Sequence, residues 1–219
     1  MLFKTLTAAA LLFSVAFAAP MDAESSDLVD ESFEAEAESI QLEARGLKQL
    51  SWSDIMTTGI RKIRPDGSAV ATVTNYISAS QNSFVANTNQ NQGTLCVRIE
   101  GFKPLAVGYQ AWLIFGGGNL EGYPVFRIDS WDNSVLTTAA DGSMKTIAKL
   151  SAKENKFCAK MTNSAGNRIA ELSINGKVLH TTKRQGTWSN IYVIARTTDA
   201  GAVAPSGPTT VIFKRPTLA

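Results

Sequence analysis

The stretch YPVFRIDSW places three side chains that suit sugar recognition on one side of a strand. Alternate side chains of a strand share a face, so Arg127, Asp129 and Trp131 lie together. Tryptophan stacks on a pyranose ring, aspartate accepts hydrogen bonds from hydroxyl groups, and arginine holds a carboxylate with two hydrogen bonds. The pattern predicts that these residues, with Arg196, bind a ligand; the alternative is an ion pair on a solvent-exposed face.

A second set of residues suits proton abstraction beside the carboxylate of a uronic acid. Arg98 or Arg127 would neutralise that carboxylate, and Tyr192 or His180 would act as the base. His180, the only histidine, ends the stretch ELSINGKVLH, whose Asn-Gly pair predicts a two-residue hairpin turn. That turn sets Glu171 opposite His180, as an acid–base couple or as a solvated cross-strand pair.

No metal or cofactor is expected from the motifs. The chain has no Cys-x-x-Cys pair and no Cys/His cluster for zinc, and no Lys-Ser/Thr follows the glycines of GGGN, as a phosphate loop requires. Asp132, Asn133, Asp141 and Asp199 offer oxygen ligands for Ca²⁺. Such loop residues are more often turn formers, so a calcium site has no further support.

Two N-terminal segments differ sharply in composition from the rest of the chain. Residues 1–19 hold one lysine before a short apolar run and small residues, as in a signal peptide, so we expect secretion and no membrane span once it is removed. Residues 20–45 hold nine acids and one base, which predicts a disordered leader or pro-segment. We expect residues 46–219 to form one domain.

Removal of the acidic leader exposes a basic domain. The chain has 21 bases and 19 acids; residues 1–45 hold two of the bases and nine of the acids, so residues 46–219 carry a net charge of +9. This charge favours an anionic partner, such as a uronic-acid polysaccharide, cell-wall phosphate, nucleic acid or a membrane surface; the alternative is that it serves solubility and cell-wall retention without a specific ligand. Among these partners we expect an extracellular polysaccharide and no nucleic acid. The two cysteines, Cys96 and Cys158, are expected to form a disulfide, with two buried thiols as the alternative.

The elements that must position these residues are short strands. Eleven runs rich in β-branched and aromatic residues alternate with turn residues such as RPDGS, AADGS and NSAGN, at spacings near ten. This pattern predicts an all-β domain of two packed antiparallel sheets or a barrel. One early segment, SWSDIMTTGI, is either a helix or a leading edge strand.

The stretch RIAELSINGKVLHTTKRQGTWSNIYVIAR, Arg168 to Arg196, resembles the late hairpin of concanavalin A-like lectins and glucanases, including laminin-G-type modules. The resemblance implies an antiparallel jelly-roll sandwich of about eleven strands. Glucanases of this kind resembling laminarinases carry a Glu-x-Asp-x-x-Glu strand, which this chain lacks. Alginate-lyase-like jelly rolls carry Arg-x-Glu-x-Arg, which is matched only by Arg98 and Glu100.

Three functions follow from these observations. The first is a secreted lectin-like domain that binds polysaccharide, of anionic character, without catalysis. The second is an enzyme, a polysaccharide lyase that uses Arg98, His180 and Tyr192 for β-elimination. The third is a secreted effector that binds a host or cell-wall protein, for which no sugar-facing residue is needed.

Overall fold

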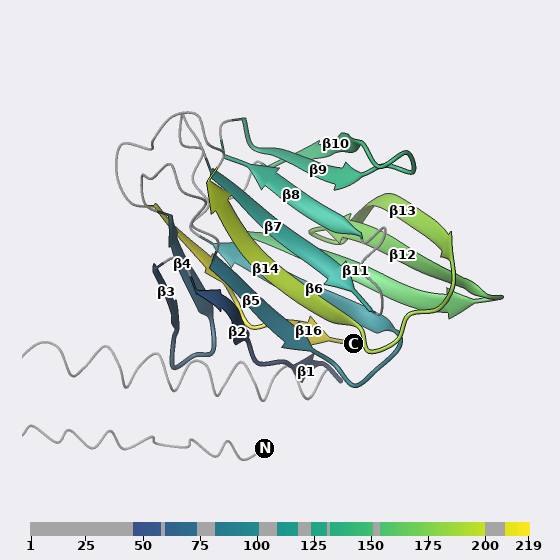
Figure 1. The fold of residues 1–219 in the computed structure, drawn as a ribbon, viewed down its shortest axis with the longest axis horizontal. Helices are drawn as coiled ribbons and strands as arrows, with labels where there is room; N and C mark the ends of the chain where they lie inside the picture. Colours follow the sequence, from purple (N-terminus) through teal and green to yellow (C-terminus); the bar gives the residue numbers. More distant parts are fainter. Residues whose placement is uncertain are drawn as a thin grey trace, which may run out of the picture.

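A computed structural model gives the structure of the chain, and it describes residues 46–57, 60–73, 82–100, 109–117, 124–130, 132–150, 154–199 and 209–219. The expected signal peptide and leader lie outside the described residues. The described chain is all-β: two antiparallel sheets stack face to face as a sandwich (Figure 1). This confirms the predicted fold class. No helix long and apolar enough to cross a bilayer occurs in the described part of the chain.

The first sheet, sheet A, has nine strands. Seven follow the order β13-β12-β11-β6-β15-β4-β3, and β16 joins β1 to β6. Their bounds are β1 Lys48–Gln49, β3 Ile60–Ile63, β4 Ala69–Val73, β6 Gly93–Glu100, β11 Asn155–Ser164, β12 Asn167–Ile174, β13 Lys177–Gln185, β15 Thr209–Phe213 and β16 Thr217–Leu218.

The second sheet, sheet B, has seven strands in the order β10-β9-β8-β7-β14-β5-β2. Their bounds are β2 Ser53–Thr57, β5 Asn82–Asn87, β7 Tyr109–Gly116, β8 Val125–Asp129, β9 Ser134–Thr138, β10 Met144–Lys149 and β14 Tyr192–Asp199. Strands distant in sequence, such as β7 and β14, are neighbours, so the sheet is assembled by long-range pairing.

All eleven predicted runs are strands, and the structure adds β1, β2, β3, β5 and β16. The early segment SWSDIMTTGI contains β2, so its edge-strand interpretation is confirmed and its helical one is wrong. The added strands are short or carry polar residues, such as the asparagines at both ends of β5. Pairing with neighbouring strands, rather than intrinsic propensity, therefore decides their conformation.

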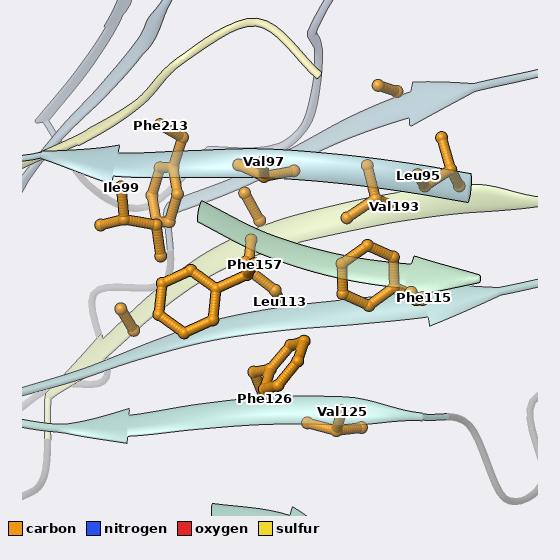
Figure 2. Close-up of a cluster of buried hydrophobic side chains, with 14 of the residues drawn as sticks. Leu95, Val97, Ile99, Leu113, Phe115, Val125, Phe126, Phe157, Val193 and Phe213 are labelled. Carbon is orange, nitrogen blue, oxygen red and sulfur yellow. The ribbon is translucent and has the colours of Figure 1, made fainter. Parts of the chain in front are cut away.

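Apolar side chains from both sheets meet between the two layers. Phe126 of β8 packs its ring against Phe115 of β7, with centroids 6.0 Å apart, and against Phe157 of β11 in the opposite sheet, at 5.2 Å. Figure 2 shows these rings between the strands of the two sheets, with Leu113 and Val97. All five side chains are fully buried, so the inward positions of the strands form the core.

Cys96 of β6 and Cys158 of β11 form a disulfide, as the cysteine count predicted. The two residues are directly opposite each other in the antiparallel register, with Cα atoms 4.1 Å apart. Their neighbours Leu95 and Val97 point into the core, so the disulfide lies on the outer face of sheet A.

The hairpin of β12 and β13 turns at Asn175 and Gly176, whose φ angles of 50° and 84° fit the predicted two-residue turn. The predicted register holds only next to the turn. A shift between Leu172 and Ser173 places His180 opposite Leu172. Glu171 faces Thr181 instead and forms an ion pair with Lys160 at 3.4 Å. The predicted Glu171–His180 couple is therefore wrong, because a bulge moves His180 to the inward side.

Candidate functional site

Polar and aromatic side chains gather on the outer face of sheet B. On β7 the residues Ala111, Leu113 and Phe115 are buried in the core, so Gln110 and Trp112 point outward. The pairing of β7 with β8 and β14 extends this pattern into two rows across three strands. One row is Arg127, Trp112 and Arg196; the next is Asp129, Gln110 and Thr198.

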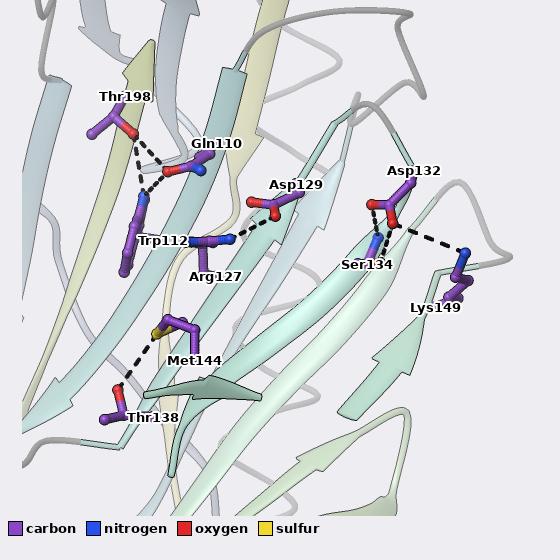
Figure 3. Close-up of polar contacts among 10 residues, drawn as sticks. All are labelled: Gln110, Trp112, Arg127, Asp129, Asp132, Ser134, Thr138, Met144, Lys149 and Thr198. Carbon is purple, nitrogen blue, oxygen red and sulfur yellow. Dashed lines mark hydrogen bonds and ion pairs between the residues drawn. The ribbon is translucent and has the colours of Figure 1, made fainter. Parts of the chain in front are cut away.

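The two rows are tied together by hydrogen bonds. The indole Nε1 of Trp112 donates to Gln110 Oε1 and to Thr198 Oγ1, both at 3.2 Å. Thr198 Oγ1 in turn donates to Gln110 Oε1 at 3.4 Å. Figure 3 shows this triad on β7 and β14 beside the Arg127–Asp129 pair. The indole is therefore held in one orientation before any ligand arrives.

Arg127 contacts two partners within the protein, Asp129 and Trp112. Its Nη2 donates to Asp129 Oδ2 at 2.8 Å, and its guanidinium carbon lies 5.7 Å from the centre of the Trp112 ring. The predicted cluster of Arg127 and Asp129 on one face is thus observed, as an ion pair within one strand. Trp131, the third member of the predicted set, lies outside the described residues.

Asp129 is almost fully buried, with 3% of its surface exposed. Burial raises the pKa of its carboxyl group above the ordinary value, although the hydrogen bond and the charge of Arg127 act in the opposite direction. The neutral acid is therefore favoured in the folded protein more than in the unfolded chain.

We expect Asp129→Asn to change how stability depends on pH. Because the pKa is raised on folding, the penalty of burying the charged group is fully present above the raised pKa and is relieved as the pH falls toward 3.8. The wild type should gain unfolding free energy relative to Asp129→Asn between pH 7 and pH 4, as measured by urea unfolding at both values.

The control for this experiment is Asp141→Asn. Hydrogen bonds from Ser143 lower the pKa of the exposed Asp141, so the stability that it adds is lost mainly below 3.8. The wild type should therefore gain no unfolding free energy relative to Asp141→Asn from pH 7 to pH 4. The same result for Asp129→Asn would contradict the assignment of a raised pKa.

Arg196 differs from Arg127 in having no carboxylate partner within the described structure. It lies on β14 between Trp112 of β7 and Ser83 of β5. The side chain is half-buried, its Nε has no hydrogen-bond partner among the described residues, and burial lowers the pKa of the guanidinium. The group stays charged at neutral pH, so it is a cation on the site face whose charge no described carboxylate balances.

Tyr192 lies further along the same face of β14, opposite Gly116 of β7 and Asn87 of β5. A β-carbon at Gly116 would lie 2.6 Å from Cζ and 2.7 Å from Oη of Tyr192. The missing side chain of Gly116 therefore makes the space that the tyrosine ring occupies. Arg196 and Tyr192, both predicted from sequence, share this face with Arg127 and Asp129.

The remaining predicted residues lie elsewhere. Arg98 is on the outer face of sheet A, where it forms an ion pair with Glu154 at 3.6 Å. His180 is on the edge strand β13, and burial and the charge of Lys145 lower its pKa. The structure therefore does not bring Arg98, His180 and Tyr192 together, because they belong to different sheets and faces.

Two of the four candidate calcium ligands, Asp132 and Asp141, have hydrogen-bond partners in turns. Asp132 accepts hydrogen bonds from Ser134, and Asp141 accepts them from Ser143, as turn-forming aspartates do. Within the described ranges, no three His, Cys, Asp or Glu side chains gather as a metal-binding group.

Gln110 and Thr198 are parts of the site that the sequence did not reveal. Their positions follow from the alternation in YQAWLIFG and from the β7–β14 register, which the sequence leaves open. Among the aromatic side chains of the described chain, Tyr109 and Trp188 are buried, while Trp112 and Tyr192 are partly exposed on the outer face of sheet B.

No family model and no curated protein matches the sequence. Solved structures do match the fold. A β-glucanase from Bacillus licheniformis has a TM-score of 0.54 at 10% identity, covering 78% of this chain and 92% of its own. The Crh5 transglycosylase has a TM-score of 0.58 at 16% identity, covering 77% of this chain and 78% of its own.

A third match is the endo-1,3-β-glucanase of Streptomyces sioyaensis, with a TM-score of 0.53 at 12% identity over 77% of this chain and 89% of that one. Identities this low show a shared fold. The chain has the concanavalin A-like jelly-roll architecture that the late hairpin implied.

Proposed function

We propose that this chain is a secreted protein that binds an acidic polysaccharide through the outer face of sheet B and performs no chemistry on it. The observation that carries the proposal is Arg196: a half-buried guanidinium with no described carboxylate partner, next to the fixed indole of Trp112. The carboxylate of a uronic acid supplies the missing negative charge and accepts two parallel hydrogen bonds from a guanidinium.

The other residues of the face fit the neutral parts of a sugar. The indole of Trp112 and the phenol ring of Tyr192 offer apolar surface to pyranose rings, as aromatic groups do in ligand sites. Gln110 and Thr198 offer polar atoms to ring hydroxyls beside them. Arg127 keeps its internal partner, so we assign it to the support of Trp112 and Asp129 rather than to the ligand carboxylate.

The absence of catalysis in this proposal rests on the carboxylates of the face. A retaining glycosidase needs two carboxyl groups about 5–5.5 Å apart, and an inverting enzyme needs them roughly 6.5–9.5 Å apart. Among the described residues of the two rows, Asp129 is the single carboxylate, and it is bonded to Arg127. We therefore do not extend the reaction of the matched glucanases to this face, because a shared fold does not imply a shared function.

The lyase alternative has weaker support. It needs a cation, a base and an acid around one uronate, and Arg98, His180 and Tyr192 do not share a face. A lyase produces an unsaturated sugar that absorbs ultraviolet light. Release of this chromophore from uronans would establish the lyase function and overturn the binding proposal.

Secretion belongs to the same proposal. It is supported by the predicted signal peptide and by the Cys96–Cys158 disulfide, because disulfides persist in oxidising compartments outside the cytosol. The test of function is a binding panel of polyuronates, chitin and β-glucans with the purified protein. Retention on polyuronates supports the proposal; failure to bind any of the polysaccharides overturns it and favours a protein target.

A glycine substitution tests whether Tyr192 belongs to the site. We expect Gly116→Ala to weaken polyuronate binding about fivefold, roughly 1 kcal/mol, because the added carbon displaces the ring of Tyr192. Tyr192→Ala should have a similar effect, and the double variant should lose no more than either single one. Additive losses in calorimetric titrations would show that the two positions act separately.

A further inference from the structure

The edge strand β13 carries three basic side chains toward the inward side of sheet A, of which Lys177 and Arg184 are permanent cations. Lys177 pairs with Ile174, His180 with Leu172, and Arg184 with Arg168. Because Ile174 and Leu172 are buried, their partners on β13 share the inward-facing side of the sheet. Lys183 points to the opposite side of the same strand and is exposed.

The edge of the other sheet adds a further cation. Strand β10 packs near β13; burial, together with the charge of Lys145 on β10, lowers the pKa of His180. Figure 1 shows β13 curving toward the β9–β10 hairpin. Arg168 of β12 is paired with Arg184 of β13, and its guanidinium carbon lies 5.2 Å from the centre of the Trp188 ring. We call Lys145, Lys177, Lys183 and Arg184 the basic edge.

The basic edge brings four cations to one border of the sandwich, whereas carboxylates pair with some of the cations on the rest of sheet A. Elsewhere, Lys160 pairs with Glu171 at 3.4 Å and Lys214 pairs with Glu100 at 3.3 Å. Over the ranges that the structure describes, no carboxylate pairs with any of the four residues of the basic edge. A concentration of unbalanced charge attracts an anionic partner.

The chain itself contains a segment of the required charge. Residues 20–45 carry nine acids and one base, and three of the acids, Glu34, Glu36 and Glu38, alternate in one short run. We propose that this acidic leader binds the basic edge in the full-length chain, and that its removal after Arg45 would free the edge. This inference does not depend on the identity of the sugar bound by sheet B.

The distance between the leader and the basic edge fits its length. In the register of sheet A, Lys48 lies in line with Leu218, Leu95, Ala159, Leu172 and finally His180. Five strand spacings separate Lys48 from His180, about 24 Å. Glu38 and Glu34 precede Gly46 by 8 and 12 residues, which span at most about 26 Å and 40 Å when extended.

Covalent attachment favours this contact further. Because the leader is part of the same chain, its effective concentration at the edge is in the millimolar range, so weak individual ion pairs are sufficient. The ion pairs are exposed, so salt screens them; the Debye length falls from about 30 Å at 0.01 M to about 3 Å at 1 M.

Zero-length carbodiimide cross-linking of the full-length chain tests the proposal, because it joins only carboxylates and amines already in contact. At low salt, mass spectrometry should find leader acids joined to Lys145, Lys177 and Lys183 at least about fivefold more often than to the exposed, paired Lys160. At 1 M salt this preference should disappear. Replacing Glu34, Glu36 and Glu38 by glutamine should reduce the cross-links of the remaining acids to the same lysines.

Cross-links spread over surface lysines in proportion to their exposure, or confined to Lys48 beside the leader, overturn the proposal. In that case the charges of β13 serve only to keep the edge strand from pairing with a second chain, a common role of lysines on sheet edges. Thermal unfolding of the glutamine variant should match that of the unchanged chain, which shows that loss of cross-links is not loss of the fold.

Discussion

Replacing both Cys96 and Cys158 by alanine should lower the free energy of unfolding by about 4 kcal/mol. The disulfide closes a loop with a sequence separation of 62, and the chain-entropy model gives roughly this value for a loop of that size. The bond joins β6 and β11, neighbouring strands within sheet A whose inward residues Val97 and Phe157 belong to the core. Urea unfolding of the double variant and the oxidised wild type measures the difference.

The reduced wild type is the matched control for this variant. Alanine at the two positions leaves small gaps on the outer face, so reduction without substitution separates the effect of the cross-link from that of packing. Both forms should lose a similar amount. A loss below about 1 kcal/mol for the double variant would show that the cross-link constrains the unfolded chain far less than the model requires.

Arg196→Ala should weaken binding to an acidic oligosaccharide about 10- to 100-fold. Hydrogen bonds to charged groups contribute about 1.5–3 kcal/mol, and each 1.4 kcal/mol corresponds to a tenfold change in the dissociation constant. Arg196→Lys should keep part of the affinity, because an ammonium group retains the charge and loses the two-pronged geometry. Calorimetric titration of the three proteins gives the dissociation constants.

Arg98→Ala is the matched control, because it removes an arginine from the opposite face of the sandwich and leaves the net charge equal to that of Arg196→Ala. Arg98 is exposed and bonded to Glu154, so its loss should change affinity less than about twofold, as for other exposed ion pairs. Equal losses in the two variants would mean that overall charge attracts the ligand and that sheet B holds no specific site.

The sequence predicts the strands of this fold well because their inward residues alternate. YQAWLIFG and YPVFRIDSW each show which side chains share a face, and the structure places Arg127 beside Asp129 as that alternation requires. Alternation cannot say which sheet a strand joins. Arg98 sits in a run with the same alternation, and it lies on the other sheet because β6 pairs with β11 rather than with β7.

Register is the second property that the local sequence does not determine. The Asn-Gly turn predicts the first pairs of the β12–β13 hairpin correctly, and one bulge then moves His180 away from Glu171. Leu172 and Ala170 of β12 are buried, and the bulge on β13 changes only which of the side chains that face them lie inward. A single inserted residue moves every later side chain of the strand to the other face, so it removes the predicted pairing of Glu171 with His180.

The candidate site depends both on the alternation of side chains along each strand and on the pairing of the strands. Alternation along one strand predicts Arg127 beside Asp129, and only the pairing of β8, β7 and β14 brings Tyr192 and Arg196 to the same face. The same pairing adds the support of Trp112 by Gln110 and Thr198. That Arg196 has no carboxylate partner among the described residues could not be predicted, because ion pairs form between strands that are distant in sequence.

Titration with a matched pair of oligouronides tests the central claim most directly: one with free carboxylates and one with the same sugars as methyl esters. Esterification removes the charge and keeps the rings, so binding by Arg196 predicts at least about tenfold tighter binding of the free acid. This preference should disappear in Arg196→Ala and persist in Arg98→Ala. Equal binding of acid and ester by the wild type, or no binding of either, would contradict the account.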